Sequence, residues 1–175
     1  GCYGDGGAVF TNNNEYAEKI KMIRVHGQNK RYHHKYIGMG GRLDTIQAAI
    51  LLAKLPHYKK ELEERERVAK SYKNTLTGNL TLPIIKSNRT SVWAQYTVRV
   101  NNRDEVQKKL QDNRIPTAIY YPVPLHLQEC FQPLNYKIKD FPITEEASNC
   151  VLSLPMNAYL DDSDIFLITK ALIDV

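Results

Sequence analysis

The segment Arg42–Leu55, with the sequence RLDTIQAAILLAKL, constrains the fold of this chain more than any other. It is strongly helical, and apolar side chains such as Leu43, Ile46 and Ile50 cover a large part of the circumference that the helix would have. A helix of this kind is buried on several sides, so we predict that other structure packs around it. Pro56 breaks or kinks the helix at its end.

A basic, tyrosine-rich segment, Gln28–Gly41, precedes this helix and is predicted to be a loop too long to be a simple connector. The net charge of the whole chain is only +5, yet seven cations and no acidic residue lie between Lys19 and Arg42. Such a block favours a phosphorylated partner, of which a small diphosphate ligand is the sharpest case. The alternative is a solvated helix face followed by a basic loop. Nucleic acid is a weaker candidate, because no RNP-type, zinc-finger or helix-turn-helix motif accompanies the charge.

The rest of the pattern predicts two parts of different character. A short strand over Ala8–Thr11 and an amphipathic helix over Glu15–Arg24, capped by Asn12–Asn14, precede the basic segment. Beyond Pro56 we predict a long surface helix, interpreted as a strut between two subdomains. From residue 79 onward the pattern is typical of a compact α+β unit with a small, mostly antiparallel sheet. Its predicted elements are a strand over Val92–Val100, a helix over Arg103–Asn113, a β-prone segment over Ile115–Tyr121, a helix from Pro142 to about Cys150, a strand over Val151–Leu154 and a helix over Asp161–Ile173.

Generic chemical motifs are weak in this sequence. The run Gly4-Asp5-Gly6-Gly7 is not a dinucleotide fingerprint, because the third glycine would fall at Val9 and a strand should precede the motif. The pair His33-His34 lacks the spacing and the further ligands of a zinc site, so no metal is expected. What the residues do indicate is a basic, glycine-containing loop ahead of a helix, able to bind an anion through cations and backbone N–H groups.

Cysteine usage and hydropathy bear on the compartment. Cys2, Cys130 and Cys150 are an odd number without metal-type spacing, which indicates reduced thiols in a cytoplasmic protein. No apolar run approaches the roughly 20 residues that a membrane helix needs, so no membrane partner is expected.

Several longer phrases carry a family resemblance. They are GCYGDGGAVFTNN, IRVHGQNKRYHHKYIGMGGRLDTIQAAILLAKL, SVWAQYTVRV, RIPTAIYYPVPLHLQ and FPITEEASNCVLSLPMNAYL. In this order they resemble the C-terminal part of pyridoxal 5'-phosphate (PLP)-dependent sugar-nucleotide aminotransferases of the DegT/StrS type. The resemblance implies an α/β fold-type I aminotransferase that works as a homodimer. Residues 1–56 would end the large PLP-binding domain, residues 57–77 would form a connecting helix, and residues 78–175 would form the small α+β domain.

The implied reaction transfers an amino group, with glutamate as the donor, to a keto group of a nucleotide-linked deoxysugar, for surface glycans or a glycosylated metabolite. In that family the Schiff-base lysine precedes the segment that matches Gly1–Gly7. We therefore expect the Met-less, glycine-rich start to be a cut beside the active site, no catalytic residue within the chain, and no activity of the chain alone. The alternatives are a PLP-free homologue, dehydratase-like or regulatory, and a basic nucleic-acid-binding module.

The resemblance also implies roles for residues that are present. The family phrase Gly-x-Asn-x-Arg corresponds here to Gly38-Met39-Gly40-Gly41-Arg42, so that Gly40 stands at the asparagine position. Backbone N–H groups of Gly40 or Gly41 would then serve the PLP phosphate of the neighbouring subunit, and Arg42 would contact anionic groups of the substrate. Asp5 would orient backbone near the cofactor, or else stabilise a turn.

Six further residues are candidates for substrate contacts. Lys30, Arg31 and Tyr32, with Lys35 beside them, are candidates for the diphosphate of the nucleotide sugar. Tyr121 and His126 belong to the YPVPLHLQ loop, which approaches the substrate in family members. His126 would contact a sugar hydroxyl or a phosphate, or would be a packed loop histidine.

Overall fold

A computed structural model describes residues 3–78 and 80–173. The chain divides into two compact units, Gly1–Tyr58 (unit 1) and Lys59–Val175 (unit 2). The division lies close to the boundary predicted after residue 56, and the two units are described separately below.

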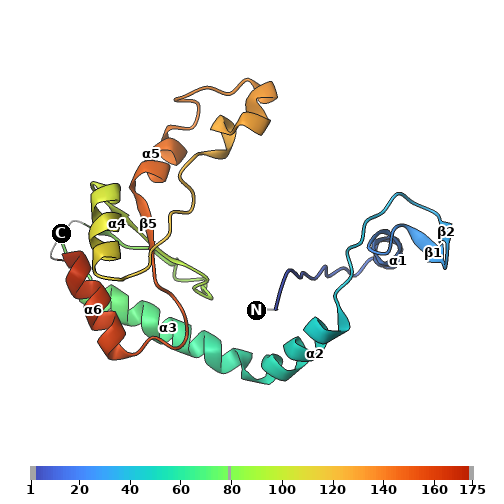
Figure 1. The fold of residues 1–175 in the computed structure, drawn as a ribbon, viewed down its shortest axis with the longest axis horizontal. Helices are drawn as coiled ribbons and strands as arrows, with labels where there is room; N and C mark the ends of the chain where they lie inside the picture. The colour runs from blue at the N-terminus through green and yellow to red at the C-terminus, as the bar shows by residue number, and fades with distance from the viewer. Residues whose placement is uncertain (1–2, 79, 174–175) are drawn as a thin grey trace. The chain divides into compact units, whose positions relative to one another are not determined.

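Unit 1 consists of two helices and a small hairpin (Figure 1). Helix α1 spans Asn14–Ile23, the strands β1 (Gln28–Lys30) and β2 (His33–His34) pair antiparallel, and helix α2 spans Thr45–Lys54. The Asn13 side chain accepts a hydrogen bond from the Tyr16 backbone N–H at 3.1 Å, which is the predicted asparagine cap. The hairpin was not predicted, because a polar pair of very short strands lacks the alternation that marks a half-buried strand.

Two glycines fix the path of the chain between the hairpin and α2. Gly27 has φ +74°, and a Cβ placed there would come within 1.7 Å of the Tyr36 carbonyl oxygen. A Cβ on Gly38 would come within 2.3 Å of the Gly27 nitrogen and 2.4 Å of the Ile23 oxygen. The returning segment therefore packs backbone against backbone, and the Met39 N–H donates to the Ile23 oxygen at 2.9 Å.

The prediction that the Arg42–Leu55 helix is buried on several sides is wrong for the part of the chain that the structure describes. Helix α2 has no buried residue, and Ile46 is 77% exposed. Among the described residues of unit 1, Gly27 alone is buried. The apolar pattern was identified correctly, but burial depends on what surrounds a helix, and these residues supply no cover. The prediction for Pro56 is confirmed, because a short 3-10 helix, η1 (Leu55–His57), separates α2 from the next helix.

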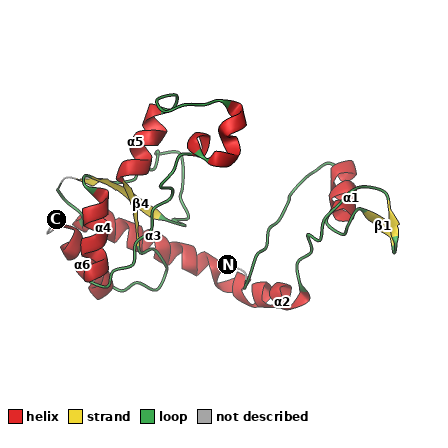
Figure 2. Ribbon diagram, turned by 45° about the horizontal axis from the view of Figure 1, so that its top comes forward, coloured by secondary structure: helices red, strands yellow, loops and turns green. Residues whose placement is uncertain are grey.

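Unit 2 is the predicted α+β unit with a small antiparallel sheet (Figure 2). The strands lie in the order β3–β4–β5, and β4 pairs with β5 in a register that places Tyr96 opposite Leu154 and Val98 opposite Leu152. The strands are β3 (Leu80–Thr81), β4 (Tyr96–Val100) and β5 (Val151–Leu154). The helices are α3 (Tyr58–Thr75), α4 (Arg103–Asp112), α5 (Pro142–Cys150) and α6 (Asp162–Ile173).

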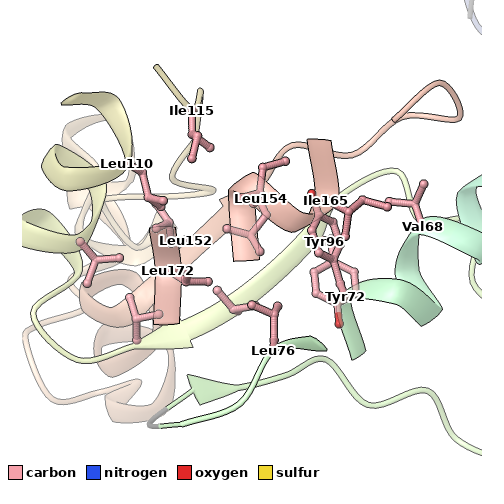
Figure 3. Close-up of a cluster of buried hydrophobic side chains, with 14 of the residues drawn as sticks. Val68, Tyr72, Leu76, Tyr96, Leu110, Ile115, Leu152, Leu154, Ile165 and Leu172 are labelled. Carbon is pink, nitrogen blue, oxygen red and sulfur yellow. The ribbon is translucent and has the colours of Figure 1, made fainter. Parts of the chain in front are cut away.

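The core of unit 2 lies between the helices α3, α4 and α6 and the sheet (Figure 3). Val68, Ala69 and Tyr72 of α3 are buried in it, so the helix predicted as a connector over residues 57–77 contributes to this core. Tyr72 and Tyr96 lie with their ring centroids 5.0 Å apart. Burial raises the pKa of Tyr96 to about 12, and burial together with Tyr96 and Asp164 raises the pKa of Tyr72 as well.

Three predicted strands are shorter or absent. Ala8–Thr11 forms no strand, and Ile115–Tyr121 contributes only an isolated bridge between Ala118 and Ser153. The strand predicted from Val92 begins at Tyr96, because Trp93 has φ +49°, a left-handed conformation that a strand cannot contain. A β-prone run becomes a strand only where a partner is available for its hydrogen bonds.

Cys130 and Cys150 are free thiols, as predicted, whereas Cys2 lies outside the described residues. In the described part of the chain, the helices are all too short or too polar to cross a membrane.

Candidate functional site

A hollow of about 780 Å³ in unit 1 brings together residues from three separate segments. It gathers four of the predicted site residues, Asp5, Gly40, Gly41 and Arg42. The side chains of Lys21 and Arg24, from α1 and the residue after it, also line it. Sequence analysis counted these two cations in the basic block but did not assign them to a site, because their meeting with Arg42 depends on the fold of the intervening loop.

The cations of this hollow differ in how they are paired. The Lys21 ammonium lies 2.6 Å from the Glu18 carboxylate in an exposed pair, which is worth little in water. Within the described residues, no carboxylate lies within ion-pair distance of Arg24 or Arg42. Two arginines without an acidic partner beside a glycine backbone form an arrangement suited to an anion.

Some backbone groups around the hollow already make hydrogen bonds within the protein. The Gly41 N–H donates to the Arg24 oxygen at 2.8 Å, so it is engaged within the protein, and Gly40 is the glycine whose N–H a ligand would use. The Asp5 backbone oxygen accepts a hydrogen bond from Gln47 Nε2 at 3.1 Å. Gln47 on α2 therefore holds the opening turn, and its Oε1 is a buried acceptor without a partner among the described residues. Sequence analysis missed Gln47, since a glutamine within an apolar helix gave no signal of its own.

Lys30, Arg31 and Tyr32 lie at the tip of the β1–β2 hairpin rather than around the hollow. Arg31 donates from Nη2 to the Tyr32 hydroxyl at 3.1 Å, and its guanidinium lies 4.9 Å from the Tyr32 ring centroid. Lys35 lies 5.6 Å from the ring centroid of Tyr36. These exposed residues form a cationic and aromatic tip, and none of them is among the residues that line the hollow.

The two remaining candidates, Tyr121 and His126, line a pocket of about 660 Å³ in unit 2. Its wall runs from Tyr120 to His126 and Gln128, and α5 supplies the other side with Thr144, Ala147 and Ser148. No Lys, Arg, Asp or Glu is among the residues that line it in the described chain. The Tyr120 and Tyr121 rings meet edge to face at 5.6 Å, and the peptide bond between them is cis. This pocket suits an uncharged ring with hydroxyl groups better than a phosphate.

His126 is anchored within the protein. Its Nε2 lies 3.0 Å from Glu145 Oε1, and its ring lies 4.8 Å from the Phe141 ring. The His126 side chain is only 7% exposed. Of the two interpretations of this residue, the packed loop histidine describes its contacts in the structure.

Within the described residues, no group of three or more His, Cys, Asp or Glu side chains is arranged to hold a metal ion.

Comparison with known proteins identifies the family to which these features belong. The DegT/DnrJ/EryC1/StrS aminotransferase family matches residues 2–173. The chain belongs to this family. The resemblance inferred from the sequence phrases is thereby confirmed.

Two relatives of this DegT/StrS family member are named as an aminotransferase and as a regulatory protein. The chain is 46% identical to the UDP-2-acetamido-2-deoxy-3-oxo-D-glucuronate aminotransferase of Pseudomonas aeruginosa, over 98% of the chain and 47% of that enzyme. It is 45% identical to a pleiotropic regulatory protein of Geobacillus stearothermophilus, over 89% of the chain and 43% of that protein. The chain thus spans about half the length of these relatives.

The fold is that of the family as well. A crystal structure of a DegT DnrJ EryC1 StrS aminotransferase from Brucella abortus matches 99% of the chain with a TM-score of 0.91 and 39% identity. The match covers 47% of that aminotransferase. The predicted α/β aminotransferase fold, represented by a part of the full structure, is confirmed.

Proposed function

We propose that this chain is the C-terminal part of a PLP-dependent aminotransferase that transfers an amino group from glutamate to a keto group of a nucleotide-linked sugar. The observation that carries the proposal is the hollow of unit 1, where Arg24 and Arg42 lie beside Gly40 with no carboxylate at ion-pair distance among the described residues. Membership of an aminotransferase family and the similarity to an enzyme named for a UDP-linked keto sugar support the substrate class. The product would serve the synthesis of surface glycans.

The hollow fits the phosphate end of PLP. The Arg24 guanidinium offers charge and the Gly40 backbone offers an N–H donor, and no side chain at Gly40 obstructs the approach. When bound, PLP supplies the electron sink that amino transfer requires. This chain's own residues would bind and orient phosphate groups, with Gly40 toward the cofactor and Arg42 toward the substrate. The Schiff-base lysine, in this proposal, precedes Gly1.

The uncharged pocket of unit 2 supports the assignment of different parts of the substrate to different sites of the chain. A nucleotide sugar combines a diphosphate with uncharged rings, and the described residues that line the pocket beside Tyr121 include none of the cations that a diphosphate needs. We assign the pocket to an uncharged ring of the substrate. The hairpin tip with Lys30, Arg31 and Tyr32 and the hollow with Arg42 are assigned to anionic groups.

The exposed apolar surface of unit 1 supports a homodimer and an upstream part of the large domain. Phe10 is 91% exposed and Ile37 is fully exposed. Exposing many large apolar side chains to water is unfavourable in free energy. We therefore propose that the rest of a longer chain and a second copy cover those of unit 1.

The experiment is an assay of the full-length polypeptide that contains this chain, purified with PLP and supplied with glutamate and a nucleotide-linked 3-keto or 4-keto sugar. We expect formation of the amino sugar and conversion of glutamate to 2-oxoglutarate, followed by mass spectrometry. The 175-residue chain alone, which is expected to be inactive, serves as the negative control. Absence of amino transfer by the full-length protein would contradict the proposal.

Arg42→Ala tests the assigned site within that assay. Loss of a charge-assisted contact to an anionic group is expected to raise KM for the nucleotide sugar about tenfold to a hundredfold. Arg89→Ala is the matched control, because Arg89 is exposed and its guanidinium donates only to the neighbouring Asn88 oxygen among the described residues. Equal KM values for both variants would remove Arg42 from the substrate site.

A regulatory homologue without amino transfer is the second candidate, favoured by the similarity to a pleiotropic regulatory protein. The same assay separates the two functions. Steep salt-dependent retention on DNA or RNA, in place of turnover, would favour the nucleic-acid-binding alternative.

A further inference from the structure

The segment 125–141 leaves the pocket wall, makes two short 3-10 helices, η2 (Leu125–Leu127) and η3 (Glu129–Leu134), and returns to the start of α5 (Figure 1). We call it the 125–141 loop. Neither short helix contains a buried residue, and Ile138 is 70% exposed. Hydrophobic burial therefore does not account for how this loop is held.

A single carboxylate holds both ends of the loop. Glu145, in the first turn of α5, accepts hydrogen bonds from the Lys139 N–H at 2.8 and 3.0 Å and from the Phe141 N–H at 3.4 Å. It also bonds His126 Nε2, at the beginning of the loop, at 3.0 Å. Glu145 is 17% exposed, so water competes weakly for these contacts.

An aromatic contact lies beside this carboxylate. The Phe141 ring lies 4.8 Å from the His126 ring and 5.2 Å from the Tyr136 ring. His126 and Phe141 are at the same time lining residues of the pocket in unit 2. The contacts that close the loop therefore also set the distance between the two walls of that pocket.

We propose that His126 and Glu145 form a positioning pair that fixes the pocket wall for an uncharged ring of the nucleotide-linked substrate. His126 acts through Glu145 and the loop, and Tyr121 is left to contact the ligand. The functional part of this inference rests on the proposed function, whereas the structural part does not.

The structural part is tested by amide hydrogen exchange in the full-length protein. Glu145→Gln removes the charge that the Lys139 N–H contacts, and we expect this amide to exchange about tenfold faster or more. Glu146→Gln is the matched control on the same helix, because Glu146 pairs with Arg99 instead of the loop. An unchanged exchange rate at Lys139 in Glu145→Gln overturns the inference whatever the activity of the enzyme.

The functional part is tested by binding of UDP-N-acetylglucosamine as the probe, measured by calorimetry on the same proteins. Glu145→Gln and His126→Phe are each expected to raise Kd about tenfold. His126→Phe keeps an aromatic ring beside Phe141 but loses the Nε2 bond, whereas His126→Gln retains an N–H donor and should restore binding. Because the two residues act as one unit, the Kd of the double variant for the probe should be no higher than the Kd of Glu145→Gln.

The outcomes separate the two proposals. Additive losses in the double variant, no rescue by His126→Gln, or an unchanged Kd would overturn the positioning role. Faster exchange at Lys139 with no probe binding by the unmodified protein would also overturn it. Unmodified enzyme that binds the probe but transfers no amino group would contradict the proposed function alone.

Discussion

At the scale of single residues, the hydroxyl of Tyr72 is a buried polar group of unit 2 that has a hydrogen-bond partner. The side chain is fully buried, and its hydroxyl donates to the Pro155 oxygen at 2.8 Å. This bond ties α3 to the segment that follows β5. Tyr72→Phe would leave the Pro155 carbonyl without its donor while keeping the ring contacts. We expect a loss of about 1–2 kcal/mol in the free energy of unfolding, measured by urea denaturation of the full-length protein.

Tyr96→Phe provides the comparison for Tyr72→Phe. Tyr96 is as buried as Tyr72, and the two rings contact each other. The Tyr96 hydroxyl, however, has no hydrogen-bond partner among the described residues. Its loss should therefore change stability less. If Tyr96→Phe were as destabilising as Tyr72→Phe, the bond to Pro155 would not be the cause.

At the scale of elements, the sequence predicted what local pattern determines. Helix α4 follows its predicted range, with Val106 and Leu110 buried as their spacing indicates, and α5 and β5 lie where Pro142 and the Val151–Leu154 run place them. Ala8–Thr11 has the composition of a strand but no partner for its backbone, so no strand forms in the described chain. Pairing and burial are properties of the surroundings, which local pattern does not contain.

The conformation of the loop between the β1–β2 hairpin and α2 depends on Gly38 more than on the other glycines of the loop. A Cβ at Gly38 would meet backbone atoms of Gly27 and Ile23 at 2.3 and 2.4 Å, and neither can move without opening the loop. We expect Gly38→Ala to lower the free energy of unfolding of the full-length protein by about 1–3 kcal/mol. Thermal unfolding of the purified protein measures this loss.

Gly40→Ala is the control for this loop. Its Cβ would approach nothing closer than the His26 ring at 3.4 Å, so the folded protein should keep its stability. Equal destabilisation by Gly38→Ala and Gly40→Ala would show that the backbone packing at Gly38 is not limiting.

At the scale of the whole molecule, the candidate site could be predicted only in part. The candidate roles of Arg42, Gly40 and Tyr121 came from a family resemblance, and generic motifs would not have singled them out. Lys21 and Arg24 lie beside Gly40 and Arg42 only after the loop has folded back along α1, and Gln47 meets the Asp5 backbone oxygen only once α2 has formed. Glu145 lacked any sequence signal, because its partners, His126 and two backbone N–H groups, are brought to it by the return of the 125–141 loop.

The two units differ most in how much of themselves they bury, and this difference predicts their behaviour in isolation. The buried apolar cluster that runs from Val68 to Leu172 lies entirely in unit 2, whereas Gly27 is the single buried residue described in unit 1. A fragment of residues 57–175 should therefore fold alone, with a cooperative thermal transition and a near-ultraviolet circular dichroism signal from the packed Tyr72 and Tyr96 rings. A fragment of residues 1–58 should show neither, because burial of apolar area drives folding and this unit lacks it. A cooperative transition in the 1–58 fragment would mean that unit 1 needs no cover, and would remove the support its exposed surface gives to a longer chain and a second copy.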